Sequence, residues 1–172
     1  VFMVSQLSMK DEVANLQYGA TQAWVYAFTF IGGLFADKIL GFRKSLFWGG
    51  MLMILGSVIL AVDPKNFFFI GISFTIVGTG FFKPNISTLL GNFYHEDQYK
   101  TKKDEGYNIF YMGINVGAFI CNFFGAALQI ALGWKYAFMA AGVGMFIGVV
   151  IFLLGTKHYG DKTEKKGIQP GD

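Results

Sequence analysis

Residues 66–93 read NFFFIGISFTIVGTGFFKPNISTLLGNF. This stretch contains one charged residue, Lys83, and is longer than the roughly 20 residues that an α-helix needs to cross a bilayer core. Counted back from Tyr94, Lys83 lies about 11 residues deep, or roughly 16 Å, which is near the middle of a membrane. We therefore predict a membrane-spanning helix with one cation at its centre.

The rest of the chain has the same character. Of the 172 residues, 53% are hydrophobic and only 15% are charged, whereas a soluble domain usually has about a quarter charged residues. The apolar stretches predict five spans and an all-α polytopic membrane protein, with Val1–Leu7 as the end of an earlier helix and Ser8 as the N-cap of the first full span. The five spans are Val13–Ala36, Ser45–Val62, Asn66–Phe93, Gly106–Ile130 and Trp134–Gly155.

The basic residues alternate between rich and poor segments. Those in the rich segments are Lys38, Arg43 and Lys44, then Lys100, Lys102 and Lys103, then Lys157, Lys162, Lys165 and Lys166. The poor segments hold one each, Lys10, Lys65 and Lys135. Because loops rich in lysine and arginine stay in the cytoplasm, we predict that the three rich segments are cytoplasmic. Residues 156–172 are then a cytoplasmic linker or tail.

Inserting a lysine into a bilayer at the predicted depth of Lys83 costs about 2.5–3.5 kcal/mol of free energy on insertion scales. Its side chain reaches only about 6 Å, which makes escape to a membrane surface difficult. We therefore expect Lys83 to face a water-filled cavity, where it meets an anionic group of a substrate or a carboxylate elsewhere in the protein. Pro84, the next residue, must bend the helix because it has no backbone N–H.

Two further polar residues reach the same depth in other spans. Tyr26 lies about 11 residues before Asp37, and Asn115 lies about 11 residues after Asp104. Tyr111 is one helical turn from Asn115 and shares its face. An ammonium, phenols and an amide at one level suit a ligand with a carboxylate and peptide-like hydrogen-bonding groups. The alternatives are an ordinary helix contact for Tyr26 and an interhelical hydrogen bond for Asn115.

Three motifs carry a resemblance to known transporters. Residues 32–44, GGLFADKILGFRK, resemble the loop between helices two and three of the major facilitator superfamily. Residues 78–85, GTGFFKPN, and 110–118, FYMGINVGA, resemble the fourth- and fifth-helix signatures of its proton-dependent oligopeptide transporter family. The order and spacing of all three match that family.

The resemblance implies that residues 1–155 are the N-terminal six-helix half of a twelve-helix carrier, from the end of helix one through helix six. Such a carrier imports di- and tripeptides by proton symport through alternating access. It implies substrate-binding roles for Lys83, Tyr26, Tyr111 and Asn115, and a gating motif that includes Gly33, Asp37, Gly41 and Arg43. The expected partners are the peptide, protons, the lipid bilayer of a bacterial inner membrane and the C-terminal half. No metal, nucleic acid or organic cofactor is expected, since the proton gradient supplies the energy.

Other functions stay open at this point. The family's first-helix Glu-x-x-Glu-Arg motif, which is tied to proton coupling, would precede Val1. Nitrate carriers share the fold and lack that motif, so a small-anion carrier is one alternative. A non-transporting membrane subunit, in which Lys83 pairs with a partner's carboxylate, is another. An enzyme is not predicted, because the sequence has no Gly-x-Ser-x-Gly, His-Glu-x-x-His or Walker-type motif.

Overall fold

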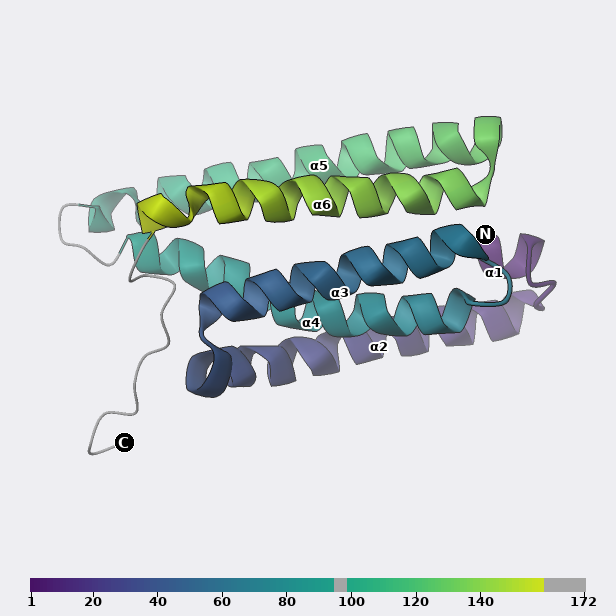
Figure 1. The fold of residues 1–172 in the computed structure, drawn as a ribbon, viewed down its shortest axis with the longest axis horizontal. Coiled ribbons are helices and arrows are strands. Elements are labelled where there is room, and N and C mark those ends of the chain that lie inside the picture. Colours follow the sequence, from purple (N-terminus) through teal and green to yellow (C-terminus); the bar gives the residue numbers. More distant parts are fainter. Residues whose placement is uncertain (95–98, 160–172) are drawn as a thin grey trace.

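The computed structural model describes residues 1–94 and 99–159, and these residues form helices and no strand. Five long helices lie side by side as a bundle (Figure 1). In chain order the elements are α1 (Phe2–Ser5), α2 (Asp11–Phe35), the π-helix η1 (Ala36–Leu40), α3 (Phe42–Val62), α4 (Phe68–Phe93), the 3₁₀-helix η2 (Lys100–Lys102), α5 (Lys103–Leu132) and α6 (Trp134–Tyr159).

Each predicted span coincides with one long helix, although most of the helices extend beyond the apolar stretch. α6 continues to Tyr159, past the predicted boundary at Gly155, and the rest of the predicted tail, 160–172, lies outside the described residues. The prediction for Ser8 is wrong. Its φ of 54° takes it out of a capping conformation, and Lys10 is the N-cap of α2.

Four helical segments of the described chain are long and apolar enough to cross a membrane, namely Asp11–Leu40, Phe42–Val62, Lys100–Leu132 and Trp134–Gly155. α4 is not among them, because Lys83, Pro84 and Asn85 lower its hydropathy. Its 26 residues nevertheless make a helix about 39 Å long, enough to cross the hydrocarbon core. The long helix that falls short of this hydropathy threshold is thus the one that carries Lys83.

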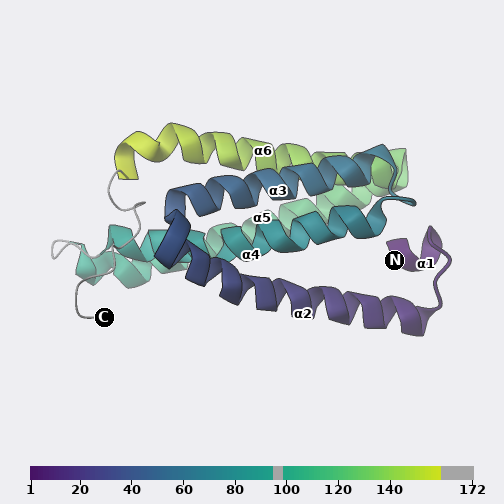
Figure 2. The ribbon, with the colours of Figure 1, turned by 60° about the horizontal axis from the view of Figure 1, so that its bottom comes forward.

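The described parts of the segments rich in basic residues share one end of the bundle. Figures 1 and 2 show the ends of α2, α4 and α6 and the starts of α3 and α5 at that end. The N-terminus, the α3–α4 turn and the α5–α6 turn lie at the other. This is the placement that the alternation of rich and poor segments requires.

Close backbone contacts join α2, α3 and α4. A Cβ atom added to Gly78 of α4 would lie 2.6 Å from the carbonyl oxygen of Gly49 in α3, closer than real Cβ contacts. At the α2–α4 crossing, a Cβ atom on Gly32 would overlap the carbonyl oxygen of Gly80. Small residues allow this approach, which replaces the hydrophobic driving force that is absent between helices in lipid.

α2 and α5 leave wide faces without a neighbour. On α5 only Gly106 is buried, and added Cβ atoms at Gly113, Gly117 and Gly125 would meet nothing within 4 Å in the described chain. The same holds for Gly19 of α2. These glycines therefore provide close-packing surfaces that the described residues do not use.

Candidate functional site

Lys83 and Tyr26 are brought together by the α2–α4 contact. The Lys83 Nζ atom lies 5.7 Å from the centroid of the Tyr26 ring, within the range of a cation–π interaction. Both side chains are exposed, Tyr26 with 68% of its surface accessible. Within the part of the chain that the structure describes, Lys83 makes no ion pair. Its positive charge is therefore available to an anion on the side of the bundle where the Lys83 and Tyr26 side chains are exposed, which we call the open side.

Pro84 interrupts the hydrogen bonding of α4 next to this lysine. Because proline has no N–H, the carbonyl oxygen of Gly80 loses its intrahelical donor. The Oγ1 atom of Thr88 donates to the carbonyl oxygen of Pro84 at 3.0 Å, which adds a side-chain hydrogen bond in the following turn. The helix remains continuous from Phe68 to Phe93 despite the proline.

Asn85, two residues after Lys83, links α4 to α2. The sequence analysis did not predict this role. Its side chain is only 1% exposed. Its Nδ2 atom donates to the carbonyl oxygen of Phe81 in its own helix and, at 3.4 Å, to that of Gly32 in α2. The sequence signal was an amide directly after Lys83-Pro84 in an apolar helix. Asn85 therefore helps to hold Tyr26 and Lys83 in register.

Replacing Asn85 by leucine should destabilise the protein. The side chain keeps a similar size, but the interhelical hydrogen bond to the carbonyl of Gly32 is lost. That carbonyl still accepts from the backbone N–H of Ala36, so the loss costs about 0.5–1.5 kcal/mol. Asn85→Asp should cost more, because a carboxylate would face two carbonyl oxygens with no donor between them. Thermal unfolding of the purified full-length protein measures both effects. Equal stability of the three proteins would contradict this role for Asn85.

Tyr111 and Asn115 lie one helical turn from each other on α5. The Asn115 Nδ2 atom donates to the carbonyl oxygen of Tyr111 at 2.9 Å, so the amide is engaged within its own helix. The Tyr111 ring stacks on Tyr107 with centroids 6.4 Å apart. Neither residue makes a hydrogen bond or ring contact with Lys83 or Tyr26 in the described structure. The four predicted residues come from three helices: Tyr26 from α2, Lys83 from α4, and Tyr111 and Asn115 from α5.

α5 is held against α4 near the basic end of the bundle. The Tyr107 hydroxyl donates to the carbonyl oxygen of Ser87 at 3.0 Å, and a Cβ atom on Gly91 would approach the same hydroxyl at 2.7 Å. A Cβ atom on Gly106 would overlap the Tyr94 ring. These contacts fix the position of α5, and hence of Tyr111, relative to Lys83.

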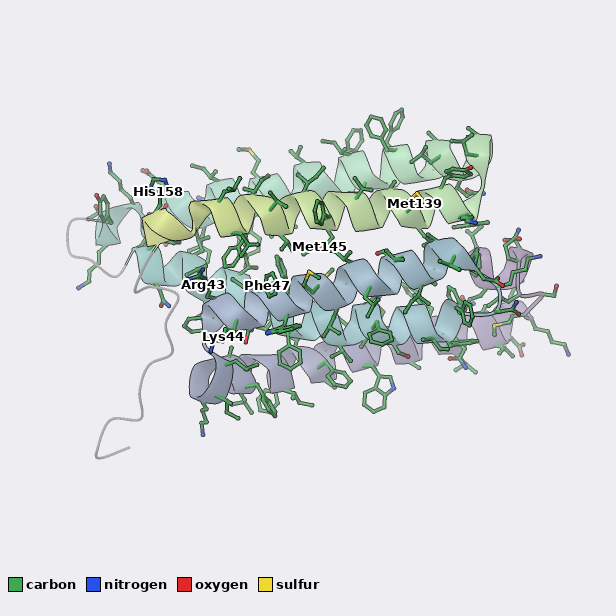
Figure 3. The ribbon with its side chains drawn as sticks, in the orientation of Figure 1. Arg43, Lys44, Phe47, Met139, Met145 and His158 are labelled. Carbon is green, nitrogen blue, oxygen red and sulfur yellow. The ribbon has the colours of Figure 1, made fainter. Side chains whose placement is uncertain are left out.

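The predicted gating motif extends from the end of α2 through η1 to the start of α3. Gly41 has φ 79° and ψ 156°, a conformation that essentially only glycine adopts. Arg43 is exposed in the first turn of α3, where Figure 3 shows it beside Lys44. The Asp37 side chain lies outside the described part. Gly33 has room for a side chain, because an added Cβ atom would meet only the Pro84 Cβ, at 3.9 Å. The position that accepts only glycine on steric grounds is Gly32.

These features define a class of protein. An all-helical polytopic bundle with a cation near mid-depth on its open side has the architecture of the N-terminal half of a major facilitator superfamily membrane transporter. This conclusion rests on the fold and on its similarity to solved structures. The chain matches a peptide transporter POT in complex with sulfate with a TM-score of 0.88 and 29% identity, over 98% of this chain and 36% of that one.

A second solved structure, a bacterial homologue of the human drug peptide transporters, matches with a TM-score of 0.83 and 29% identity, over 98% of this chain and 40% of the other. The family model PTR2, described as the POT family, matches residues 43–170. The chain belongs to the POT family, and it is part of an integral membrane protein.

Three curated relatives are similar in sequence. The chain is 37% identical over 134 residues to the uncharacterized transporter YclF of Bacillus subtilis, covering 77% of this chain and 27% of the relative. It is 34% identical over 149 residues to the peptide transporter YePEPT of Yersinia enterocolitica, covering 85% and 29%. It is 36% identical over 149 residues to a di-/tripeptide transporter of Lactobacillus helveticus, covering 78% and 29%. The chain thus spans less than a third of the length of these relatives.

Proposed function

We propose that these residues are the N-terminal half of a carrier that imports di- and tripeptides by proton symport through alternating access. The observation that carries the proposal is the Lys83 ammonium, exposed on the open side of the bundle beside the Tyr26 ring and without an ion pair among the described residues. A cation near the membrane midplane needs an anionic partner, and a peptide carboxylate supplies one. The names of the relatives and structural neighbours support a peptide as the substrate.

The polar groups of α5 complete the proposed pocket. The Tyr111 hydroxyl and the Asn115 amide can exchange hydrogen bonds with the amides of a bound peptide. Asn115 can use its side-chain oxygen for this purpose, because only its Nδ2 atom is engaged with Tyr111. A pocket with a cation on one side and neutral hydrogen-bonding groups on the other favours a short peptide over a small anion that has no amide groups.

The open faces of α2 and α5 support a second half-bundle as the partner. Glycines with nothing within 4 Å, such as Gly19, Gly113 and Gly117, permit close helix contacts that only further helices can make in lipid. Rocking of the two halves would expose the pocket to each side in turn. The turn that contains Asp37, Gly41 and Arg43 would then act as a gate at the cytoplasmic end of a bacterial inner membrane carrier.

Competition experiments separate this function from carriage of a small anion. Proteoliposomes containing the full-length protein should take up a labelled dipeptide when an inward proton gradient is imposed. Unlabelled dipeptide should inhibit this uptake, whereas nitrate at the same concentration should not. A dipeptide amide, which lacks the carboxylate that pairs with Lys83, should compete at least about tenfold less well, as expected for a lost charge-assisted contact of about 1.5–3 kcal/mol.

Each alternative has its own outcome in this assay. Saturable nitrate uptake without dipeptide uptake would favour the anion carrier. A protein that takes up neither solute would favour a non-transporting membrane subunit. Equal competition by the dipeptide and its amide would remove the carboxylate from the proposed contact with Lys83.

A further inference from the structure

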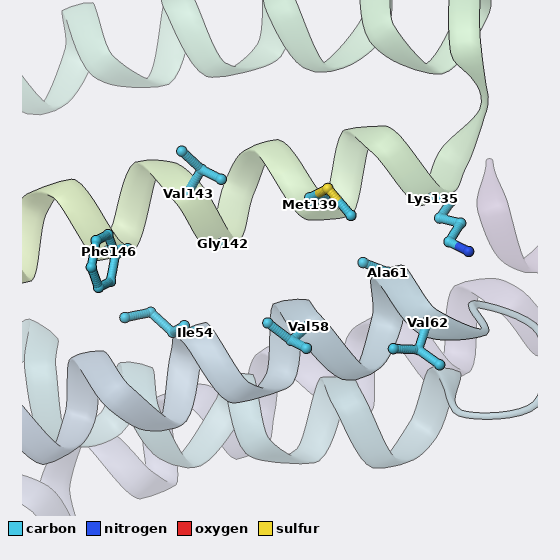
Figure 4. A pocket seen from close by; sticks show the side chains of 9 residues that line it. All are labelled: Ile54, Val58, Ala61, Val62, Lys135, Met139, Gly142, Val143 and Phe146. Atoms are coloured by element: carbon cyan, nitrogen blue, oxygen red, sulfur yellow. The ribbon is translucent and has the colours of Figure 1, made fainter.

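An apolar groove runs between α3 and α6, away from the Lys83 site. It has a volume of about 430 Å³, within the range of clefts that bind small molecules. Figure 4 shows the residues that line it, which come from both helices. The lining residues are Ile54, Val58, Ala61, Val62, Lys135, Met139, Gly142, Val143 and Phe146.

The groove lies on a different side of α6 from the contact of that helix with α1. Phe138 packs against Phe2 of α1 with ring centroids 5.5 Å apart. Met139 is the next residue, and successive side chains of an α-helix point about 100° apart. Met139 and Val143 are both exposed. The groove therefore opens outward rather than toward α1.

Its length matches one leaflet of a bilayer. From Lys135 to Phe146 the helix rises about 16 Å, close to half of a hydrocarbon core about 30 Å thick. Lys135 lies at the groove's end near the start of α6, between Trp134 and Tyr136, and aromatic residues of this kind mark the level of lipid headgroups. An acyl chain that enters beside Lys135 would thus extend to about the middle of the membrane.

The charge at the mouth of the groove is not paired within the protein. Lys135 makes no ion pair among the described residues. The nearby carboxylate of Asp63 is engaged instead by Asn66 Nδ2 at 2.7 Å and by the backbone N–H groups of Lys65 and Asn66 at 3.2 Å each. The hydrogen bonds from Asn66 are the main reason that the pKa of Asp63 lies below its usual value, and Lys135 adds a weaker electrostatic contribution. The Lys135 ammonium is therefore available to an external anion.

We infer that this groove binds an anionic phospholipid, with one acyl chain between α3 and α6 and its headgroup phosphate against Lys135. An apolar channel one leaflet long that ends at an exposed ammonium complements such a lipid in shape, polarity and charge. The site lies in the leaflet at the end of the bundle opposite the basic segments. It shares no residue with the proposed peptide pocket.

Native mass spectrometry of the full-length protein tests this inference. The protein is equilibrated with phosphatidylglycerol or phosphatidylcholine of identical acyl chains, and the lipid retained is counted. Wild-type protein should retain phosphatidylglycerol in preference. Lys135→Gln should lower that preference about fivefold, the effect expected for one lysine near a membrane surface. Lys10→Gln, which removes a cation at the same end but outside the groove, should leave it unchanged.

Filling the groove tests the apolar half of the site. Val58→Trp and Val143→Trp should lose the retained phosphatidylglycerol, whereas Leu154→Trp, on the same helix as Val143 but outside the groove, should keep it. Equal retention of the two lipids by the wild type would overturn the inference. So would a phosphatidylglycerol preference that survives Lys135→Gln, or full retention in the Val58 and Val143 variants. The lysine variant tests the headgroup contact even if a tryptophan variant fails to fold.

Discussion

Dipeptide uptake driven by a proton gradient should be abolished in the full-length carrier when Lys83 is replaced by alanine. The side chain is exposed on the open side of the bundle, so its removal leaves the packing of α4 intact. The peptide carboxylate would lose the cation that pairs with it in the proposed pocket. Breaking such a charge pair costs about 2–5 kcal/mol, which lowers uptake at least about 30-fold. Initial rates of labelled dipeptide uptake in proteoliposomes measure the loss.

Lys65→Ala is the matched control for this experiment. Lys65 is also exposed, but it lies in the turn between α3 and α4, far along α4 from Lys83. Its replacement should leave uptake unchanged. Thermal unfolding of both variants should match that of the wild type, which separates loss of binding from loss of folding. Undiminished uptake by Lys83→Ala would remove the basis of the proposed site.

The second large effect is expected at the crossing of α2 and α4. Gly32→Leu should prevent these helices from packing, because even a Cβ atom at this position would overlap the Gly80 carbonyl. Overpacking of a tight contact costs about 1–3 kcal/mol, and more where backbone rather than a side chain must move. The variant would also disturb the hydrogen bond from Asn85 to Gly32. We expect little folded protein after purification, measured by size-exclusion chromatography and thermal unfolding.

Gly33→Ala provides a stringent comparison. It changes the adjacent glycine, but an added methyl group would meet only the Pro84 Cβ at 3.9 Å, an ordinary van der Waals contact. This variant should fold and unfold like the wild type. If Gly32→Leu were as stable as Gly33→Ala, the close approach of α2 and α4 would not be present in the folded protein.

Much of the fold was predictable from the sequence, because the bilayer imposes strong length and charge constraints on it. The apolar stretches located all five long helices of the described chain, whereas the cytoplasmic placement of the basic segments stays a prediction. Depth along each helix put Tyr26 and Lys83 at one level, and the structure shows them as neighbours. α3 begins at Phe42 rather than Ser45, because a helix can continue through Arg43 and Lys44 outside the apolar region.

The contacts between helices were less predictable. The role of Asn85 depends on Gly32, which is 53 residues away in sequence, and nothing local marks the pair. The choice between Gly32 and Gly33 depends on the rotation of α2 about its own axis, and adjacent positions differ by about 100°. A helix with apolar residues on several faces gives a weak signal for that rotation. Depth alone likewise does not fix the distance between helices, so a common pocket for Tyr111, Asn115 and Lys83 stays a prediction.

The contact between Gly32 and Gly80 has a consequence for the proposed alternating access. The backbones of α2 and α4 are in contact at these glycines, with no side chain between them that could change its packing. We therefore expect α2 and α4 to move as one rigid body. The separation of Tyr26 from Lys83 should then stay constant while the substrate chamber changes shape. Spin labels placed on these two helices would report one distance distribution in both the inward- and outward-open states.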